Sequence, residues 1–376
     1  MSLNTDNPAA VMQRCIELAQ RAAGQTAPNP LVGSVVVKDG QVVGEGFHPK
    51  AGEPHAEVFA LRAAGAAAAG LTLYVNLEPC NHTGRTLPCT AAIMAAGSRS
   101  VVIGLRDPNP QASGGVERLR EAGIQVTTGI EQQPCEQLNE AFIHRVRHRR
   151  PFGVFKYAMT LDGKIAASSG HSSWVTSPAA RQQVHGLRGR CDAVIVGGQT
   201  VRQDNPRLTT HGVHGHNPLR VVMSRKLDLP AQAHLWQTDV AETTVFTQLT
   251  PAGNVPNPSL AAALQQQGVI VEALPLLTPT AAMQALYQQG LLSVLWECGG
   301  TLAARAVAEG MVQKVWAFIA PKLIGGDAAA TPLGDMGLTQ MDCAIALHSS
   351  TVQSVGPDWL IQGYLAPPSV SDEGET

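Results

Sequence analysis

The sequence predicts an α/β protein made of two domains. The chain has 376 residues, which is long for one domain. β-Branched runs alternate with helix-length segments, a pattern typical of layered α/β folds. The alternation restarts after a basic segment that ends before Pro151. We therefore expect a first domain over residues 1–150, a second over 151–365 and a disordered tail over 366–376.

Caps and turns place the elements of the first domain. Asn7-Pro8 predicts an N-capped helix that Gly24 closes. Asp39-Gly40 predicts a hairpin turn between strands over 31–37 and 42–43. The remaining expected elements are helices over 54–69, 88–96, 115–122 and from 134 into the basic run HRVRHRR, and strands over 71–77, 101–104 and 124–127.

The second half shows the same alternation. The expected strands cover 154–160, 193–196, 219–223, 243–246, 294–297 and 315–319, and the expected helices cover 178–187, 280–289 and 301–309. The two halves therefore belong to the same broad class.

Composition excludes several classes of function. The formal net charge is −2, so no overall basic field attracts nucleic acid or an anionic membrane. The basic run that includes Arg145 fits the end of a helix, where positive side chains are favourable. No apolar run reaches the roughly 20 residues of a membrane helix, and the start MSLNTDNPAA lacks the apolar core of a secretory signal. An odd number of cysteines, seven, favours a reduced, cytoplasmic protein.

Two short motifs in the first half indicate a metal site. The string HAE supplies His55, and two prolyl-cysteine pairs supply Cys80 and Cys89. A catalytic zinc ion takes three such ligands and keeps one position for water. Glu57 then stands beside the ligands as a free carboxylate that can move protons.

The prolines of these motifs support the zinc interpretation. Pro54 and Pro88 would place His55 and Cys89 at the first turns of two helices. A helix N-terminus lowers a thiol pKa and so favours the thiolate that zinc requires. The alternative is a helix with a surface histidine and two buried structural thiols.

These motifs resemble one family of zinc deaminases. H-x-E followed by P-C and a second cysteine is the signature of zinc nucleobase deaminases, although here eight residues, NHTGRTLP, separate the cysteines. With P-N-P at 28–30 and His48-Pro49, the sequence resembles the bifunctional riboflavin-biosynthesis deaminase–reductases, whose first domain has a cytidine-deaminase-like three-layer α/β/α fold. The resemblance implies that the pyrimidine and its ribose phosphate contact Asn29, His48, His82 and Arg85.

The resemblance also implies two consecutive reactions. The first is zinc-dependent hydrolytic deamination of 2,5-diamino-6-(5-phosphoribosylamino)pyrimidin-4-one, in which Glu57 takes a proton from water and passes protons to the ring and to the departing ammonia. The second is an NADPH-dependent reduction that converts the ribosyl group to a ribityl chain.

The second half carries its own motifs. The second half resembles the reductase domain of the same family, which has a dihydrofolate-reductase-like α/β fold. The motifs that carry this resemblance are LDGKIA, the Ser and Trp that follow it, T-V-x-x-D-N-P-x-L and W-E-x-G-x-T-L. Gly299-Gly300 lies between a strand and a helix, where backbone N–H groups can bind phosphate. A tight packing turn is the alternative for these glycines.

Residue roles in the reductase come from the resemblance. Lys156, on the first strand of this half, is the candidate to polarise or orient the ribose. The implied substrate contacts are Ser172, Arg188, Leu208, His211 and Glu297. The implied NADPH contacts are Ala158, Trp174, Thr200, Asp204, Ser224, Gly299, Gly300, Thr301, Leu302, Ala303, Ala304 and Arg305. Spacing alone does not distinguish NADPH from NADH.

Two positions depart from the family pattern. His211 stands where many members carry the arginine that pairs with the substrate phosphate, and an exposed histidine is only partly charged near pH 7. Met223 replaces an acid that is usual before Ser224. The run HGVHGH at 211–216 is either a glycine-rich surface loop or a second metal site.

Two other functions remain open from the residues alone. One is a nucleobase or tRNA deaminase with an accessory nucleotide-binding domain, which would need a basic substrate face. The other is a zinc-stabilised binding protein without catalysis, for which a fourth protein ligand would be usual. We expect a small-molecule enzyme with zinc and NADPH, no nucleic-acid or membrane partner, and a homo-oligomeric state, either dimer or tetramer.

Overall fold

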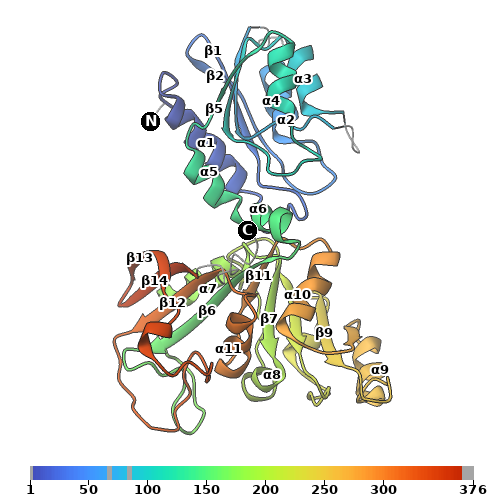
Figure 1. Cartoon of the computed structure of the whole chain (residues 1–376), viewed down its shortest axis with the longest axis vertical. Coiled ribbons are helices and arrows are strands. Elements are labelled where there is room, and N and C mark those ends of the chain that lie inside the picture. Colours follow the sequence, from blue (N-terminus) through green and yellow to red (C-terminus); the bar gives the residue numbers. More distant parts are fainter. Residues whose placement is uncertain (1–2, 66–69, 83–86, 366–376) are drawn as a thin grey trace, which may run out of the picture. The chain divides into compact units, whose positions relative to one another are not determined.

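The computed structural model describes residues 3–65, 70–82 and 87–365. The chain divides into two compact units, Met1–Arg149 and Arg150–Thr376 (Figure 1). Arg85 and the tail over 366–376, both named in the sequence-based predictions, lie outside the described residues. Among the helices of the described part, none is long and apolar enough to cross a membrane.

Unit 1 is built on a five-stranded sheet in the order β2-β1-β3-β4-β5. β1 pairs antiparallel with β2 and β3, whereas β3, β4 and β5 are parallel. The strands are β1 (Gly33–Lys38), β2 (Gln41–Phe47), β3 (Thr72–Leu77), β4 (Ser100–Leu105) and β5 (Gln125–Thr128). Each corresponds to a strand expected from the sequence.

Helices cover both faces of this sheet. α1 and α5 lie together on one face, and α2, α3 and α4 lie on the other (Figure 1). The helices are α1 (Pro8–Gln20), α2 (Ala56–Ala64), α3 (Cys89–Ala95), α4 (Gly115–Glu121), α5 (Gln132–Leu138) and α6 (Glu140–His148). The predicted three-layer α/β/α arrangement is confirmed.

Glycines let helix α2 lie against the sheet at short range. A Cβ atom built on Gly46 of β2 would lie 2.6 Å from the carbonyl oxygen of Ala56, at the start of α2. A Cβ on Gly44 would collide with the backbone of Ala60 in the same way. Because His55 is the N-cap of α2, this close packing determines where the proposed zinc ligand lies.

The prediction of one helix from residue 134 to 150 was wrong. The chain forms two helices, α5 and α6, separated at Asn139. The buried Asn139 side chain accepts a hydrogen bond from the Leu31 N–H at 2.8 Å and donates one to the Leu31 carbonyl at 3.0 Å. An asparagine that binds another segment's backbone interrupts its own helix.

Unit 2 contains a nine-stranded sheet in the order β10-β9-β8-β7-β11-β6-β12-β14-β13. The first seven strands in this order are parallel, and β14 and β13 are antiparallel additions at one edge. The strands are β6 (Phe152–Thr160), β7 (Ala193–Gly197), β8 (Leu219–Met223), β9 (Thr243–Gln248), β10 (Ile270–Leu274), β11 (Ser293–Trp296), β12 (Lys314–Ala320), β13 (Leu347–Val355) and β14 (Asp358–Leu365).

Sequence patterns missed β10, β13 and β14, as well as two helices of unit 2. The helices are α7 (Pro178–Arg188), α8 (Gly198–Asp204), α9 (Pro258–Gln266), α10 (Pro279–Gln288) and α11 (Gly300–Ala308), of which α8 and α9 were not predicted. β13 is the edge strand, and most of its side chains are exposed. It therefore lacks the alternation of apolar and polar residues by which half-buried strands are recognised.

Candidate active sites

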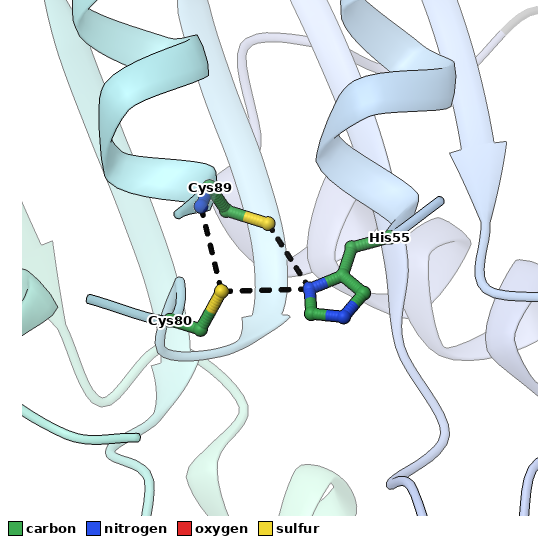
Figure 2. Close-up of side chains that lie close together, drawn as sticks. All are labelled: His55, Cys80 and Cys89. Atoms are coloured by element: carbon green, nitrogen blue, oxygen red, sulfur yellow. Dashed lines mark hydrogen bonds between the residues drawn. The ribbon is translucent and has the colours of Figure 1, made fainter. Parts of the chain in front are cut away.

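Three side chains that could hold a metal ion meet in unit 1. His55 is the N-cap of α2, Cys89 is the first residue of α3, and Cys80 follows β3. His55 Nδ1 lies 3.1 Å from Cys89 Sγ and 3.5 Å from Cys80 Sγ (Figure 2). All three donor atoms lie within 4.8 Å of one another. Helix entry points therefore place two of the three donors, as the prolines predicted.

The geometry of this cluster fits zinc. With zinc–sulfur and zinc–nitrogen bonds of about 2.3 and 2.0 Å, tetrahedral donors lie roughly 3.5 Å apart, close to the observed separations. Glu57, in the first turn of α2, is buried, and its Oε2 atom has no hydrogen-bond partner in the described part of the chain. A buried carboxylate oxygen without a partner needs a polar ligand, because burial without a hydrogen bond is unfavourable.

The two sulfurs differ in charge. A hydrogen bond from the Cys89 thiol, with a further contribution from His55, holds the pKa of Cys80 at about 4 against the effect of burial. The same sulfur–sulfur hydrogen bond, together with burial, raises the pKa of the Cys89 thiol. Binding of a metal ion by both sulfurs as thiolates would therefore release a proton from the Cys89 thiol.

A pocket next to these donors brings together most of the residues expected to contact the pyrimidine. Asn29, His48 and His82 line it together with Glu57 and with two of the candidate metal ligands, His55 and Cys80. Arg85, the fourth expected contact, is outside the described residues. With the exception of Cys89, the described members of the predicted deaminase site therefore line one pocket.

Asn29 and His48 form a defined pair within this pocket. His48 is buried, and burial lowers its pKa, so the ring is neutral near pH 7. His48 Nδ1 lies 3.1 Å from the carbonyl oxygen of Pro54, which can only accept, so Nδ1 carries the proton. His48 Nε2 then accepts a hydrogen bond from the Asn29 amide at 3.0 Å. The Asn29 amide is thereby oriented with its oxygen available to a ligand.

Several further polar residues of the pocket were not predicted from the sequence, among them Glu78 and Arg145. Two more are Asp107 and Asn109. Both follow β4, at the carboxyl end of a parallel strand, where ligands of open α/β sheets bind. Burial raises the pKa of Asp107 to about 6. The run RDPNP after an apolar strand was the signal that could have identified them.

The buried Glu78 of the EPC motif fixes the loop that carries these residues. Its carboxylate accepts hydrogen bonds from the N–H groups of Asp107 at 3.1 Å, Gly114 at 3.1 Å and Val116 at 3.0 Å. It thus joins the loop after β4 and the first turn of α4 to the segment that bears Cys80.

In unit 2, three charged side chains form a partly enclosed cluster. Glu297 accepts two hydrogen bonds from Arg188, at 2.6 and 3.0 Å, and Lys156 Nζ lies 3.4 Å from Glu297 Oε2. The Lys156, Arg188 and Glu297 side chains are only 16, 12 and 8% exposed. Phe155 of β6 pairs with Trp296 of β11, so the next residues, Lys156 and Glu297, lie side by side.

The charges of this cluster compensate one another. Burial alone would raise the pKa of Glu297, but Arg188 and Lys156 lower it to about 2, so Glu297 stays ionised. Burial lowers the pKa of Lys156, and Glu297 partly opposes that effect. Arg188 also donates to the Thr209 carbonyl at 2.9 Å, so its guanidinium is largely committed to protein partners.

The other residues expected in the reductase site follow the carboxyl ends of parallel strands. Thr200 and Asp204 lie on α8 after β7, Ser224 follows β8, and Ala158 lies near the end of β6. Parallel strands present their carboxyl ends along one edge of the sheet, so these positions share that edge with Glu297.

Local contacts link several of these positions. Asp204 is hydrogen-bonded to Ser172, and burial raises the Asp204 pKa more than that bond lowers it. Trp174 is 68% exposed, and the Arg181 guanidinium carbon lies 4.2 Å from the centre of its ring. Leu208, by contrast, is a buried residue with φ of 52°. An exposed tryptophan face beside a cation is available for stacking with a flat ligand.

The two readings of the Gly299-Gly300 turn apply to different glycines. A Cβ on Gly300 would lie 2.7 Å from the Thr331 carbonyl oxygen, so Gly300 is needed for packing. A Cβ on Gly299 would meet nothing within 4 Å, and Gly299 is exposed at the N-terminus of α11. The open position at Gly299 fits the approach of a nucleotide phosphate.

The expected contacts further along α11 divide by exposure. Thr301 and Arg305 are exposed, Leu302 is partly buried, and Ala303 and Ala304 are buried. Only the exposed face of this helix is available to a ligand.

The histidine-rich loop of unit 2 contacts helix α7 and the residues after it. The rings of His185 and His211 are stacked with centroids 4.2 Å apart. His216 Nε2 lies 2.9 Å from the carbonyl oxygen of Gly189, and the His214 ring fills the space beside the same glycine. Within the described ranges, the single group of three or more potential metal ligands is the one in unit 1. Nothing in the structure explains the Met223 departure.

Comparison with known proteins gives consistent results for both units. Residues 151–361 match the family model of the RibD C-terminal domain, and residues 5–105 match that of the cytidine and deoxycytidylate deaminase zinc-binding region. Riboflavin biosynthesis protein RibD of Synechocystis sp. is 59% identical, and the alignment spans 94% of this chain and 95% of that protein. RibD of Escherichia coli is 39% identical over 92% of this chain and 96% of its own length.

A solved structure agrees over almost the whole chain. The crystal structure of a diaminohydroxyphosphoribosylaminopyrimidine deaminase/5-amino-6-(5-phosphoribosylamino)uracil reductase from Thermotoga maritima superposes with a TM-score of 0.85 at 36% identity. The match covers 96% of this chain and 99% of that one.

Proposed function

Because the chain belongs to the bifunctional riboflavin-biosynthesis deaminase–reductase family, we propose that its two units act in turn on one pyrimidine ribotide. The protein is a deaminase and a reductase that uses zinc and NADPH. The proposed first substrate is 2,5-diamino-6-(5-phosphoribosylamino)pyrimidin-4-one, and the proposed second substrate is its deaminated product, as in the name of the Thermotoga maritima relative.

In unit 1, His55, Cys80 and Cys89 are proposed to hold the zinc ion. A zinc ion held by these residues would acidify a water molecule and so supply a nucleophile near neutral pH. Glu57 is proposed to take the water proton, protonate a ring nitrogen and then protonate the departing ammonia. The unpartnered, buried Glu57 Oε2 beside three metal donors is the observation that carries this proposal.

Substrate contacts in unit 1 follow from the pocket. Asn29, fixed by His48, is proposed to hydrogen-bond the pyrimidine, and His82 lies at the exposed side of the pocket. Arg85 remains the proposed phosphate contact, since a guanidinium can bind a phosphate through two hydrogen bonds.

In unit 2, Lys156 is proposed to orient the ribose through its amino group, which lies beside Glu297; the Glu297 charge opposes the lowering of the Lys156 pKa by burial. Bound NADPH would supply the hydride for C1 of the sugar. The bond from C1 to the ring oxygen would break and the ring oxygen would take up a proton, which leaves a ribityl chain. Glu297, Arg188, Ser172, Leu208 and His211 are proposed to surround the substrate.

The proposed cofactor site lies at the carboxyl ends of β6, β7, β8 and β11. The residues proposed to line it are Ala158, Trp174, Thr200, Asp204, Ser224 and the segment from Gly299 to Arg305. The open position at Gly299 and the exposed Trp174 ring support this assignment.

The alternative of a nucleobase or tRNA deaminase with an unrelated appendix does not account for the second half. Residues 151–361 match the RibD C-terminal domain, and the buried Lys156–Glu297–Arg188 cluster has no role in such an enzyme. Two further expectations stay part of the proposal. One is a cytoplasmic location, supported by the odd number of cysteines, seven, and the other is a dimeric or tetrameric state.

The test is to follow the two reactions separately in Glu57→Gln. The amide keeps the size of the side chain but cannot accept a proton, so ammonia release should fall by about 10²- to 10⁴-fold. Zinc content should remain at that of the wild type, and NADPH oxidation on the deaminated substrate should be unchanged. Near wild-type ammonia release from this variant would show that the role given to Glu57 is wrong.

A further inference from the structure

A pair of stacked imidazoles lies beside the charged cluster of unit 2. The His185 ring, on α7, and the His211 ring, in the loop after α8, have centroids 4.2 Å apart and planes inclined by 23°. His185 precedes Arg188 by three residues on one helix, and residues at this spacing share a helix face. The His185–His211 pair is therefore placed close to the proposed substrate site by two separate segments.

The charged groups that face this pair are mostly positive. Arg188 on α7 acts on both rings, Lys156 on β6 acts on His185, and Arg207 in the loop acts on His211. Glu297 is the one acid whose charge is felt by His185, and both of its oxygens are already bound by Arg188 and Lys156. The surroundings of the pair thus favour an anion.

The rings themselves are uncharged at neutral pH. Burial, followed by Arg188 and His211, lowers the pKa of His185 to about 4. Burial, followed by Arg188 and Arg207, also lowers the pKa of His211. A dianionic phosphate among these groups would reverse the balance, because an opposite charge within about 4–6 Å favours the protonated imidazole.

We propose that His185 and His211 together bind the phosphate group of the reductase substrate and take up a proton from solvent when it binds. The proposal rests on the proposed reduction of a pyrimidine ribotide and adds His185, which the family resemblance does not assign. Because Arg188 is committed to Glu297 and Thr209, the two stacked imidazoles are the groups that we assign to the phosphate. If the stack serves only to pack the loop on α7, phosphate binding will not depend on either ring's charge.

Proton uptake on binding makes the affinity for the phosphate decrease as pH rises. A group whose pKa is higher in the complex than in the free protein favours binding at low pH, and this contribution is lost as pH rises through the pKa of the complex. The affinity can change by at most about tenfold per pH unit for each proton taken up. Because a phosphate monoester is mostly dianionic above about pH 6, the KM of the reductase should rise with pH between pH 6.5 and 8.5.

The first experiment counts protons. Ribose 5-phosphate is titrated calorimetrically into the zinc-loaded full chain at pH 7.5 in two buffers of different ionisation enthalpy, with ribose as the uncharged control. We expect uptake of close to one proton in the wild type and nearly none in His211→Arg or His185→Phe. The matched control is His348→Gln, which removes an exposed histidine of β13 and should behave as the wild type.

The second experiment compares KM profiles for the deaminated substrate with NADPH. The wild-type KM should rise several-fold from pH 6.5 to 8.5, whereas the His211→Arg profile should be nearly flat. The proposal would be overturned if the wild type and His211→Arg showed identical KM profiles and identical proton uptake. It would also be overturned if the wild type did not bind ribose 5-phosphate, even with an active reductase. If ribose 5-phosphate binds with proton uptake that His211→Arg abolishes, but no NADPH is oxidised, the phosphate site stands and the proposed reaction fails.

Discussion

The two candidate sites of this protein are assembled in different ways. In unit 1 the three metal donors come from residues 55–89, and each stands at the beginning or just past the end of a helix or strand. In unit 2 the central cluster joins Lys156 and Glu297, which are 141 residues apart, through neighbouring parallel strands. The first arrangement depends on local chain geometry, and the second depends on strand order.

This difference shows in what stabilises each site. The unit 1 site places an imidazole, two sulfurs and an unpartnered carboxylate oxygen around a position that a metal ion would fill. The unit 2 site already balances one acid against two bases, so its charges support the fold as well as the chemistry. Changes at the two sites should therefore separate metal loss from loss of stability.

The largest separation is expected from Cys89→Ser. The weaker hydroxyl ligand should release zinc, and deamination should fall on the order of a thousandfold or more, since the metal supplies several kcal/mol of stabilisation to the transition state. Reduction of the deaminated substrate should be unchanged. Metal analysis and separate assays of ammonia and NADPH check this, with Cys343→Ser, an exposed thiol, as the control.

Glu297→Gln should reverse that pattern. Two buried cations would lose their acid, so unit 2 should be destabilised by about 3 kcal/mol and reduction should fall by about 10²-fold, with deamination retained. All five tryptophans of the chain lie in unit 2, so their fluorescence reports the unfolding of that unit. Glu242→Gln, at an exposed position, should leave both properties unchanged.

The stability of unit 2 at low pH gives a further test of the Glu297 ion pairs. Because the folded-state pKa of Glu297 is about 2, below its ordinary value of 4.5, its contribution to stability is present above about pH 4.5 and is lost as pH falls toward 2. The wild-type denaturation midpoint of unit 2 should therefore fall more steeply over this range than that of Glu297→Gln. Parallel curves would contradict the ion-pair assignment.

A smaller effect is expected from Gly46→Ala, which tests whether packing positions the metal site. The added methyl group would meet the backbone of α2, with a cost of about 1–3 kcal/mol and a zinc affinity lower by about tenfold. Competition with a chromophoric chelator measures the affinity. Gly186→Ala on α7, where a Cβ meets nothing within 4 Å, is the control and should not weaken zinc binding.

The smallest effect is expected from Asn139→Ala. Loss of both hydrogen bonds to Leu31 should cost about 1–3 kcal/mol and raise the deaminase KM a few-fold, because Leu31 lies two residues from Asn29. Zinc content should not change. Asn139→Asp keeps the acceptor for the Leu31 N–H, so its stability and its deaminase KM should lie between those of Asn139→Ala and the wild type. A wild-type KM in Asn139→Ala would exclude a positioning role for Asn139.

Sequence alone was sufficient for the parts of this protein that depend on short spacing. The helix start at Asn7, the hairpin at Asp39-Gly40 and most of the alternating elements follow from local backbone preferences. The grouping of His55, Cys80 and Cys89 was predictable because prolines and strand ends restrict where those side chains can point. The position of Arg85 is still a prediction.

Only the tertiary structure decided the features that depend on distant partners. Nothing near Asn139 in the sequence indicates that its amide binds Leu31, 108 residues away, and so interrupts a helix. The edge strand β13 has mostly exposed side chains and therefore no alternation to detect. The pairing of Lys156 with Glu297 and the stacking of His185 on His211 arise because strand order and loop packing bring separate segments together, and local sequence periodicity carries no information about either.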